Sequence, residues 1–332
     1  MKDKENLHGL LSTWNPLILS RSFFISTLFM LLPAALAVSA DSRFELRHGS
    51  STLEVLVDER FSARSVEEIR NWLEPLSQSL LLAYGNWPRD RWRVQVIPTA
   101  SSGTDPIPWA QVNRGDVDRV SFYVGAEPRA DQLIKAWTGY HEFAHLLIPY
   151  RGYGDLWFSE GLASYYQNLL QARAGILDES TMWQKLHDGF ERGAAQTQFD
   201  DAPLAALSDG MHGMGAYMRV YWSGAWYFLV ADARLRQQSG GRLSLDSALA
   251  RLNECCADLE LSVPDMVERL DRLNRVVLFE PLYKEMRQRR GMPDHRDVFR
   301  SLGIRIDKGE VVLQSLGPGA SLRTDIAQGD PR

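Results

Sequence analysis

Residues 141–145 read His-Glu-Phe-Ala-His, so two histidines stand four residues apart with a glutamate directly after the first. Apolar residues recur around this motif at spacings of three and four, which predicts a helix over residues 131–148. Side chains four residues apart lie one turn above each other on one helix face. His141 and His145 can therefore bind the same metal ion, with Glu142 beside it. The alternative is a pair of core histidines bonded to the backbone, since buried imidazoles need polar partners.

A third ligand is expected on the next predicted helix, residues 155–174. Catalytic zinc sites use three protein ligands and keep a fourth position open. Glu160 lies near the start of this otherwise apolar helix, where a carboxylate is either paired or bound to a metal. Gly161 allows a second helix to approach closely, as two helices that share an ion require. The sequence thus predicts one zinc ion per chain, held by His141, His145 and Glu160, although other divalent ions suit the same ligands.

Composition excludes several classes of protein. The chain has 332 residues, of which 45% are hydrophobic and 24% charged, which is typical of a globular protein and not of a disordered one. Lys and Arg total 37 against 42 Asp and Glu, a net charge of −5, so no nucleic-acid partner is expected. The two cysteines, Cys255 and Cys256, are neighbours. Cys256 falls on an apolar helical stripe and is expected to be a small buried side chain, with a redox role as the alternative.

The first 40 residues have the pattern of a targeting segment. Basic residues precede an apolar run over residues 23–37, and Val38-Ser39-Ala40 supplies small residues for cleavage. We expect a secretory signal that is cut near Ala40, and hence an exported protein, periplasmic or secreted. In the alternative the apolar run, which is nearly long enough to span a bilayer, stays uncut and anchors the chain in a membrane.

The order of predicted elements indicates an α+β protein with two lobes. Strands are predicted over residues 53–57, 92–97 and 120–124, with a helix over 65–82 and a loop over 99–118. Helices dominate after residue 130, and a hairpin is predicted near the end, with strands at 304–306 and 311–313. The expected domains are an N-terminal α/β lobe over 41–130, a helical lobe with the metal site over 131–302, and a C-terminal hairpin and tail over 303–332.

A few further polar residues carry weaker expectations. Asp155 is expected to cap its helix, with a hydrogen bond to a histidine ring as the alternative. His187 and His212 are expected to be surface or structural histidines, and His212 lies in a Gly- and Met-rich stretch that could border a cleft. A solvated helix face is expected for Arg287, Arg289 and Arg290.

Residues 156–166 read Leu-Trp-Phe-Ser-Glu-Gly-Leu-Ala-Ser-Tyr-Tyr, and together with the His-Glu-x-x-His motif they resemble the gluzincin zinc peptidases. The resemblance is closest to the glycyl aminopeptidase (PDZ-containing peptidase) family and more distant to the one-zinc aminopeptidases. It implies a thermolysin-like two-lobed catalytic domain, with a strand-rich N-terminal lobe and a helical C-terminal lobe. It also implies a peptide or protein substrate and Glu160 as the third zinc ligand.

The resemblance continues at residues 220–225, Val-Tyr-Trp-Ser-Gly-Ala, which are similar to the Y-Y-x-K-G-A run of that family. The tyrosine three residues before the glycine assists catalysis there and maps onto Tyr221, whereas Ser223 stands at the lysine position. The strand motif that holds the substrate backbone in these families has no counterpart in the sequence. Endopeptidase and aminopeptidase activity are therefore both open.

The function implied is hydrolysis of peptide bonds. Zinc would supply a nucleophilic water near neutral pH, and Glu142 would take its proton and pass it to the leaving amine. Tyr221 would stabilise the oxyanion. Two alternatives are a catalytically silent zinc-fold binding or scaffold protein, and a zinc enzyme acting on a non-peptide ester or amide.

Overall fold

The computed structural model describes residues 42–100, 104–152 and 154–330. Contacts gather the described residues into one compact unit. The domain divisions expected at residues 130 and 302 stay predictions. The expected targeting segment lies outside the described residues. Among the described residues, no helix combines the length and the apolar character needed to cross a membrane.

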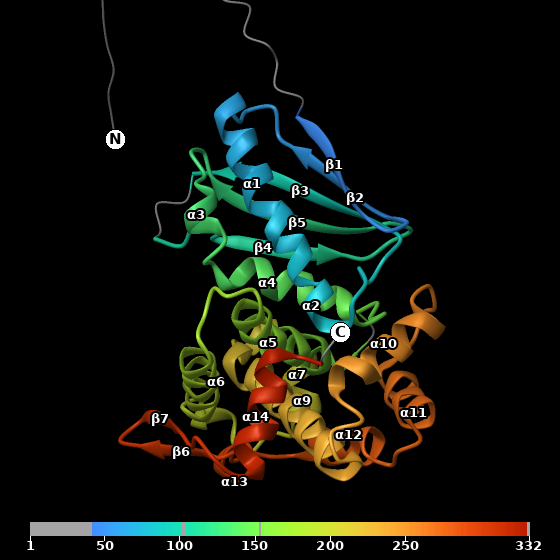
Figure 1. The fold of residues 1–332 in the computed structure, drawn as a ribbon, viewed down its shortest axis with the longest axis vertical. Helices are drawn as coiled ribbons and strands as arrows, with labels where there is room; N and C mark the ends of the chain where they lie inside the picture. Colours follow the sequence, from blue (N-terminus) through green and yellow to red (C-terminus); the bar gives the residue numbers. More distant parts are fainter. Residues whose placement is uncertain (1–41, 101–103, 153, 331–332) are drawn as a thin grey trace, which may run out of the picture. The chain divides into compact units, whose positions relative to one another are not determined.

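A five-stranded sheet forms the N-terminal part (Figure 1). Its strands, in spatial order, are β1 (Arg43–His48), β2 (Ser51–Val57), β3 (Arg91–Thr99), β5 (Asp118–Gly125) and β4 (Trp109–Asn113). β2, β3 and β5 run parallel to one another, while β1 and β4 are antiparallel edge strands. The predicted strands are confirmed as β2, β3 and β5. β4 instead falls in the stretch predicted to be a loop, because its apolar alternation is limited to Ala110 and Val112 and its side chains are exposed or only partly buried.

Helices form most of the remaining chain, so the α+β class is confirmed. The helices are α1 (Ala63–Ser79), α2 (Leu81–Tyr84), α3 (Ala130–Leu133), α4 (Trp137–Ala144), α5 (Leu156–Arg173), α6 (Glu179–Ala194), α7 (Leu204–Asp209), α8 (Met211–Met214), α9 (Tyr217–Ser239), α10 (Leu245–Cys256), α11 (Val263–Asn274), α12 (Phe279–Gln288), α13 (Arg296–Ser301) and α14 (Pro318–Gln328). The fold also has two 3₁₀ turns, η1 (His145–Leu147) and η2 (Thr197–Phe199). A hairpin near the end of the chain is formed by β6 (Ile304–Asp307) and β7 (Glu310–Leu313).

The single helix predicted over residues 131–148 is wrong in one respect, because it is broken into α3, α4 and η1. Ala136, just before α4, is extended with a ψ of 128° and separates the first two. Leu133 and Ala136 are nevertheless both buried. An apolar face that continues across a break keeps its periodicity, so spacing alone could not show the interruption.

Aromatic contacts hold α4 against the sheet. Phe143 of α4 meets Trp92 of β3 edge-on, with ring centroids 5.0 Å apart, and Phe122 of β5 at 5.8 Å. Trp72 of α1 meets Phe122 at 5.0 Å. α4 also packs closely on α5. The motif helix is therefore fixed between the strand-rich and the helical parts.

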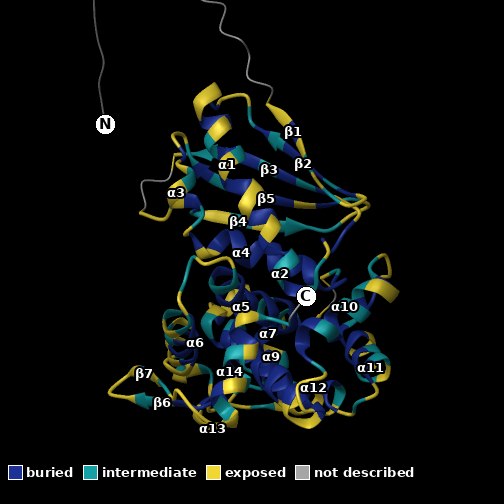
Figure 2. Cartoon of the chain, in the orientation of Figure 1, coloured by how far each residue is buried: buried dark blue, intermediate teal, exposed yellow. Residues whose placement is uncertain are grey.

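Helix α5 is buried along most of its length and lies among the other helices (Figure 2). It packs on α9 through two glycines, Gly161 of α5 and Gly224 of α9. A methyl group on Gly161 would come within 2.3 Å of the Gly224 Cα, and one on Gly224 within 2.1 Å of the Trp157 carbonyl oxygen. The close approach that Gly161 was predicted to allow is thus confirmed, and its partner is α9.

Replacing Gly224 by alanine is expected to lower the free energy of unfolding by about 3 kcal/mol, because the added methyl group must push apart two buried helix backbones. Gly213 of α8 is the matched control, since a methyl group there meets nothing within 4 Å. Gly213→Ala is expected to change stability by less than about 1 kcal/mol. Urea unfolding followed by circular dichroism measures both, and equal midpoints for the two variants would contradict the packing argument.

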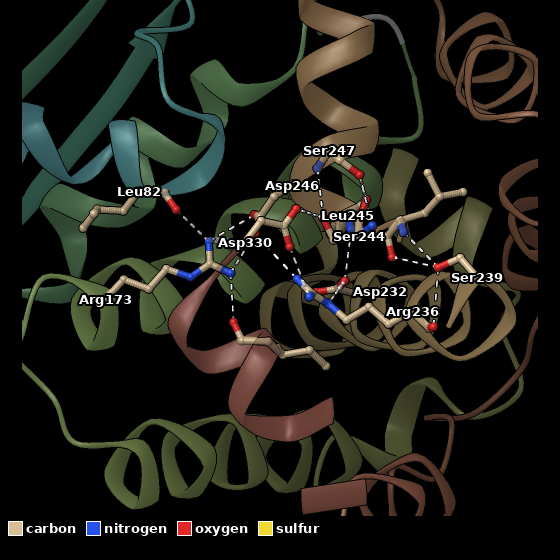
Figure 3. A network of polar contacts seen from close by, with 12 residues as sticks. Leu82, Arg173, Asp232, Arg236, Ser239, Ser244, Leu245, Asp246, Ser247 and Asp330 are labelled. Atoms are coloured by element: carbon tan, nitrogen blue, oxygen red, sulfur yellow. Dashed lines mark hydrogen bonds and ion pairs between the residues drawn. The ribbon is translucent and has the colours of Figure 1, made fainter. Parts of the chain in front are cut away.

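A buried network of charges fixes α5, α9 and α10 (Figure 3). Arg173 of α5 pairs with Asp246 of α10 at 3.0 Å, and Arg236 of α9 pairs with Asp232 at 2.9 Å. Arg236 also reaches Asp330, just after α14, at 3.2 Å. These four central charges are almost wholly buried and each has an opposite partner, which a buried charge requires. Glu160 therefore stands on a helix that its neighbours hold from several sides.

The two cysteines lie at the end of α10. Cys256 is buried, as expected, but a disulfide bond joins it to Cys255, so neither is a free thiol.

Candidate metal centre

The three predicted ligands come together between α4 and α5. His141 lies on α4, His145 begins the turn η1 directly after it, and Glu160 projects from the first two turns of α5. The Nε2 atom of His141 is 3.2 Å from Oε2 of Glu160, and that of His145 is 3.6 Å from the same oxygen. Ligands on one tetrahedral zinc ion, with bonds of about 2.0–2.2 Å, stand about 3.4 Å apart. The residues present therefore fit such an ion.

A hydrogen bond to the other ring nitrogen orients each imidazole. Nδ1 of His141 donates to Oε1 of Gln167 at 2.8 Å, and Nδ1 of His145 is hydrogen-bonded to Oγ of Ser159 at 2.9 Å. Both partners are on α5: Ser159 directly precedes Glu160, and Gln167 lies two turns after it. With Nδ1 engaged, each Nε2 is directed toward the carboxylate, as in metal sites whose histidines have outer partners. Sequence reasoning missed both residues, although their positions around Glu160 on one helix could have indicated them.

Burial sets the protonation of the site. It raises the pKa of Glu142 to about 7, so this carboxyl can take up and release a proton near neutral pH. It lowers the pKa of His145 to about 3, which keeps that imidazole neutral. A neutral imidazole is the form that binds a metal ion.

Arg114, in the turn between β4 and β5, contacts the end of the motif. Its guanidinium donates to the carbonyl oxygen of His145 at 2.5 Å and pairs with Asp118 at 2.7 Å. The last carbonyl groups of a helix otherwise lack a partner, so this contact fixes where the motif ends. No pattern in the sequence links Arg114 to a segment more than 30 residues away.

The cluster opens into a cavity of about 670 Å³. His141, Glu142, His145, Glu160, Tyr221 and His212 all line it, together with β4 and the residues on either side of that strand. The ring of Tyr221, on α9, stacks on that of His141 with the ring centroids 5.8 Å apart. Burial raises the pKa of Tyr221 well above its usual value, so the hydroxyl stays protonated and able to donate. The predicted position of His212 at a cleft is confirmed.

Strand β4 forms one wall of this cavity and has a free edge. It pairs with β5 on one side and, among the described residues, with no strand on the other. Residues 108–114 all line the cavity. The sequence showed no counterpart of a substrate-binding strand, yet the structure places the edge of β4 at the cluster.

Two expectations near the site are wrong. Asp155 makes no cap hydrogen bond and touches no histidine ring. It accepts instead from Nε1 of Trp157 at 3.1 Å, from the hydroxyl of Tyr283, and from Nε of Arg287 at 2.9 Å. Asp155 has a left-handed backbone, with a φ of 45°, which turns its carboxylate away from the first helical turn. Arg287, expected to be solvated, is the partner that neutralises this buried carboxylate.

Two histidines on and directly after the motif helix and a glutamate on the following helix are the arrangement that the resemblance to the gluzincin zinc metallopeptidases implies. The sequence model of the M61 glycyl aminopeptidase family matches residues 151–223, which include Glu160 and Tyr221. The resemblance to that family is therefore confirmed over this segment. No curated protein matches the chain in sequence.

Solved structures agree in fold. An aminopeptidase N family protein from Idiomarina loihiensis is 15% identical, with a TM-score of 0.60 over 80% of this chain and 50% of that one. Leukotriene A4 hydrolase from Saccharomyces cerevisiae is 14% identical, with a TM-score of 0.51 over 76% of this chain and 40% of its own. An M1 zinc metallopeptidase from Deinococcus radiodurans with Tyr-Ser-Ala bound is 15% identical, with a TM-score of 0.50 over 76% of this chain and 52% of that one. The chain thus spans about half the length of these structures or less.

Proposed function

We propose that the chain is a zinc-dependent metallopeptidase that hydrolyses peptide bonds. The observation that carries the proposal is the meeting of His141, His145 and Glu160 at ligand distances, with Glu142 beside them in an open cavity. When bound, zinc supplies Lewis-acid activation of a water molecule and of the scissile carbonyl group. The three side chains leave one coordination position free, as a catalytic site needs.

Glu142 acts as the general base in this proposal. Its carboxylate takes the proton of the attacking water and then passes it to the nitrogen of the leaving amine. The raised pKa suits both steps, because a group that titrates near 7 can accept and donate at neutral pH. A bound cation would shift that pKa downward and keep the carboxyl ionised at the start of the reaction.

The free edge of β4 is proposed to bind the substrate backbone. An extended peptide can add to an exposed strand edge through main-chain hydrogen bonds. Such a peptide would run along the wall that faces the two histidines. The carboxylates lining the described cavity are those of Asp105, Glu142 and Glu160. Asp105 accepts from the amide of Ile107 through Oδ1 and keeps Oδ2 available to a terminal amine, so endopeptidase and aminopeptidase activity both stay open to test.

Peptide hydrolysis by purified, zinc-loaded protein tests the proposal. Each sequence in a peptide set is offered with a free and with an acetylated amino terminus. Cleavage of both forms at internal bonds supports an endopeptidase, whereas cleavage of the free form alone would show an aminopeptidase. Zinc-bound protein that leaves every peptide intact would favour the silent binding or scaffold protein instead.

Tyr221→Phe is expected to lower kcat/KM by about a hundredfold without loss of zinc. The hydroxyl is proposed to donate a hydrogen bond to the developing oxyanion, and the loss of one such donor typically costs 10²–10³ in rate. Tyr217, exposed on the same face of α9, is the control, and Tyr217→Phe is expected to retain nearly full activity. Steady-state kinetics and metal analysis measure both, and a Tyr221→Phe enzyme of normal rate would assign the ring to packing only.

The exported location stays a proposal. It rests on residues 1–40, and the amino-terminal sequence of the protein recovered from cells distinguishes cleavage near Ala40 from an uncut, membrane-anchored segment.

A further inference from the structure

A second group of metal-binding side chains lies apart from the cavity described above. His187 and Glu191 are on α6, and His295 directly precedes α13. Their donor atoms all lie within 4.8 Å of one another, and none of the three lines the first cavity. We propose that these residues form a second divalent-cation site, best suited to zinc, which joins α6 to the C-terminal part of the chain.

The fold brings the three side chains together from distant positions. His187 and Glu191 are one helical turn apart and so share a face of α6. His295 occupies the position before the first turn of α13 but makes no cap hydrogen bond there, so its ring is free to turn toward α6. His187, expected to be a surface or structural histidine, is in fact buried against a partner 108 residues further on, which no spacing could show.

Aromatic side chains pack against the imidazole of His295. The ring of Phe190 lies 4.9 Å from that of His295, and the ring of Phe299 lies 5.0 Å from it on another side. Both histidines are about 96% buried, His187 and His295 each being 4% exposed. The ring nitrogens are therefore held away from solvent, where each needs a polar partner or a metal ion.

The separations suit one ion after small shifts. Nδ1 of His187 is 2.8 Å from Nε2 of His295, which is 4.0 Å from Oε1 of Glu191. Ligands of a tetrahedral zinc ion stand about 3.4 Å apart, so these two distances must change by about half an ångström. The donor atoms of His187 and Glu191, which lie within 4.8 Å of each other, must also move closer. A hydrogen bond between the two imidazoles would satisfy one nitrogen of each ring and would leave Glu191 with Arg296 as its charged partner.

The charges near Glu191 allow this arrangement. Its carboxylate is half-exposed, which leaves a path for the ion to enter. Arg296 is the cation facing it, 3.9 Å from the same oxygen, but its side chain is 60% exposed and also pairs with Asp294. A bound dication would compete successfully for Glu191, because two buried nitrogen ligands hold it at the same point.

The site would strengthen an existing attachment. Gln184 of α6 already bonds the hairpin, donating to the carbonyl oxygen of Gly309 at 3.0 Å and accepting from the amide of Val311 at 2.7 Å. The cation would add a link from α6 to α13, which leads directly into that hairpin. Its role is therefore structural, and peptide hydrolysis does not require it.

Zinc stoichiometry of the full chain, measured after zinc loading and extensive dialysis, tests the proposal. The wild type is expected to hold two zinc ions, and the double variant His141→Ala with His145→Ala one. His295→Phe alone is expected to hold one and to keep its peptidase activity, while the triple variant holds none. His48→Ala, which removes a half-buried histidine of β1 that belongs to neither group of ligands, is the control and keeps two. If the wild type held one zinc ion, and the double variant His141→Ala with His145→Ala held none, the second site would be overturned and the first would stand.

A second measurement covers the case in which His295→Phe does not fold. Glu191→Ala changes a half-exposed side chain, so folding tolerates it. In the double variant that lacks the first site, zinc titration is expected to raise Tm, because binding to the folded state stabilises it. Adding Glu191→Ala should weaken the zinc affinity at least tenfold, and an unchanged affinity would exclude this site.

Discussion

Glu142→Gln is expected to lower kcat of peptide hydrolysis by about a thousandfold while the protein keeps its zinc. The amide of glutamine has nearly the shape of the carboxyl group but cannot take a proton from water, and positioned general bases typically contribute 10²–10⁴ in rate. Glu142 is not among the residues whose donor atoms cluster for a metal, so the ion should remain. The rate and the zinc content are measured on the same preparation.

Glu127→Gln is the matched control, because it makes the same chemical change at an exposed residue. It is expected to leave both the rate and the zinc content unchanged. Glu142→Gln protein that retains a tenth or more of the wild-type rate would remove Glu142 as the base. Loss of zinc together with activity would mean that Glu142 helps to hold the ion.

The core of the site could be predicted because its geometry is local. A spacing of four residues on a helix places both histidine side chains on the same face. The break at Ala136 lies before the motif and does not change this placement. Glu160 could be predicted because a carboxylate among large apolar side chains needs a partner. The match over residues 151–223 agrees with that assignment.

The remainder of the site depends on tertiary contacts that leave no pattern in the sequence. Arg114 reaches the carbonyl oxygen of His145 across 31 residues, and His187 meets His295 across 108. The apolar alternation of strand β4 is limited to Ala110 and Val112, so its pairing with β5 is what defines it. Its free edge is nevertheless the feature from which binding of the substrate backbone is proposed.

Glu160→Ala is expected to lose the zinc ion of the first site. The rate of peptide hydrolysis should fall with it by a factor of at least ~10³. The carboxylate supplies one of three protein ligands and the only negative charge among them, so its loss weakens the attraction for a dication. The two imidazoles would keep their bonds to Gln167 and Ser159 and stay in place. The expected loss is therefore one of affinity rather than of fold.

Removing the zinc with a chelator and adding it back distinguishes a loss of zinc affinity from a loss of folded structure. Removal of zinc from the wild type should abolish hydrolysis, and stoichiometric zinc should restore it. Glu160→Ala should regain activity only at zinc concentrations far above those that saturate the wild type, whereas Glu127→Ala should behave like the wild type. Unchanged Tm values in the metal-free state would show that α5 still packs on α4 and α9. If Glu160→Ala held its zinc as firmly as the wild type, the third ligand would have to be another residue, and the cluster would no longer support a gluzincin mechanism.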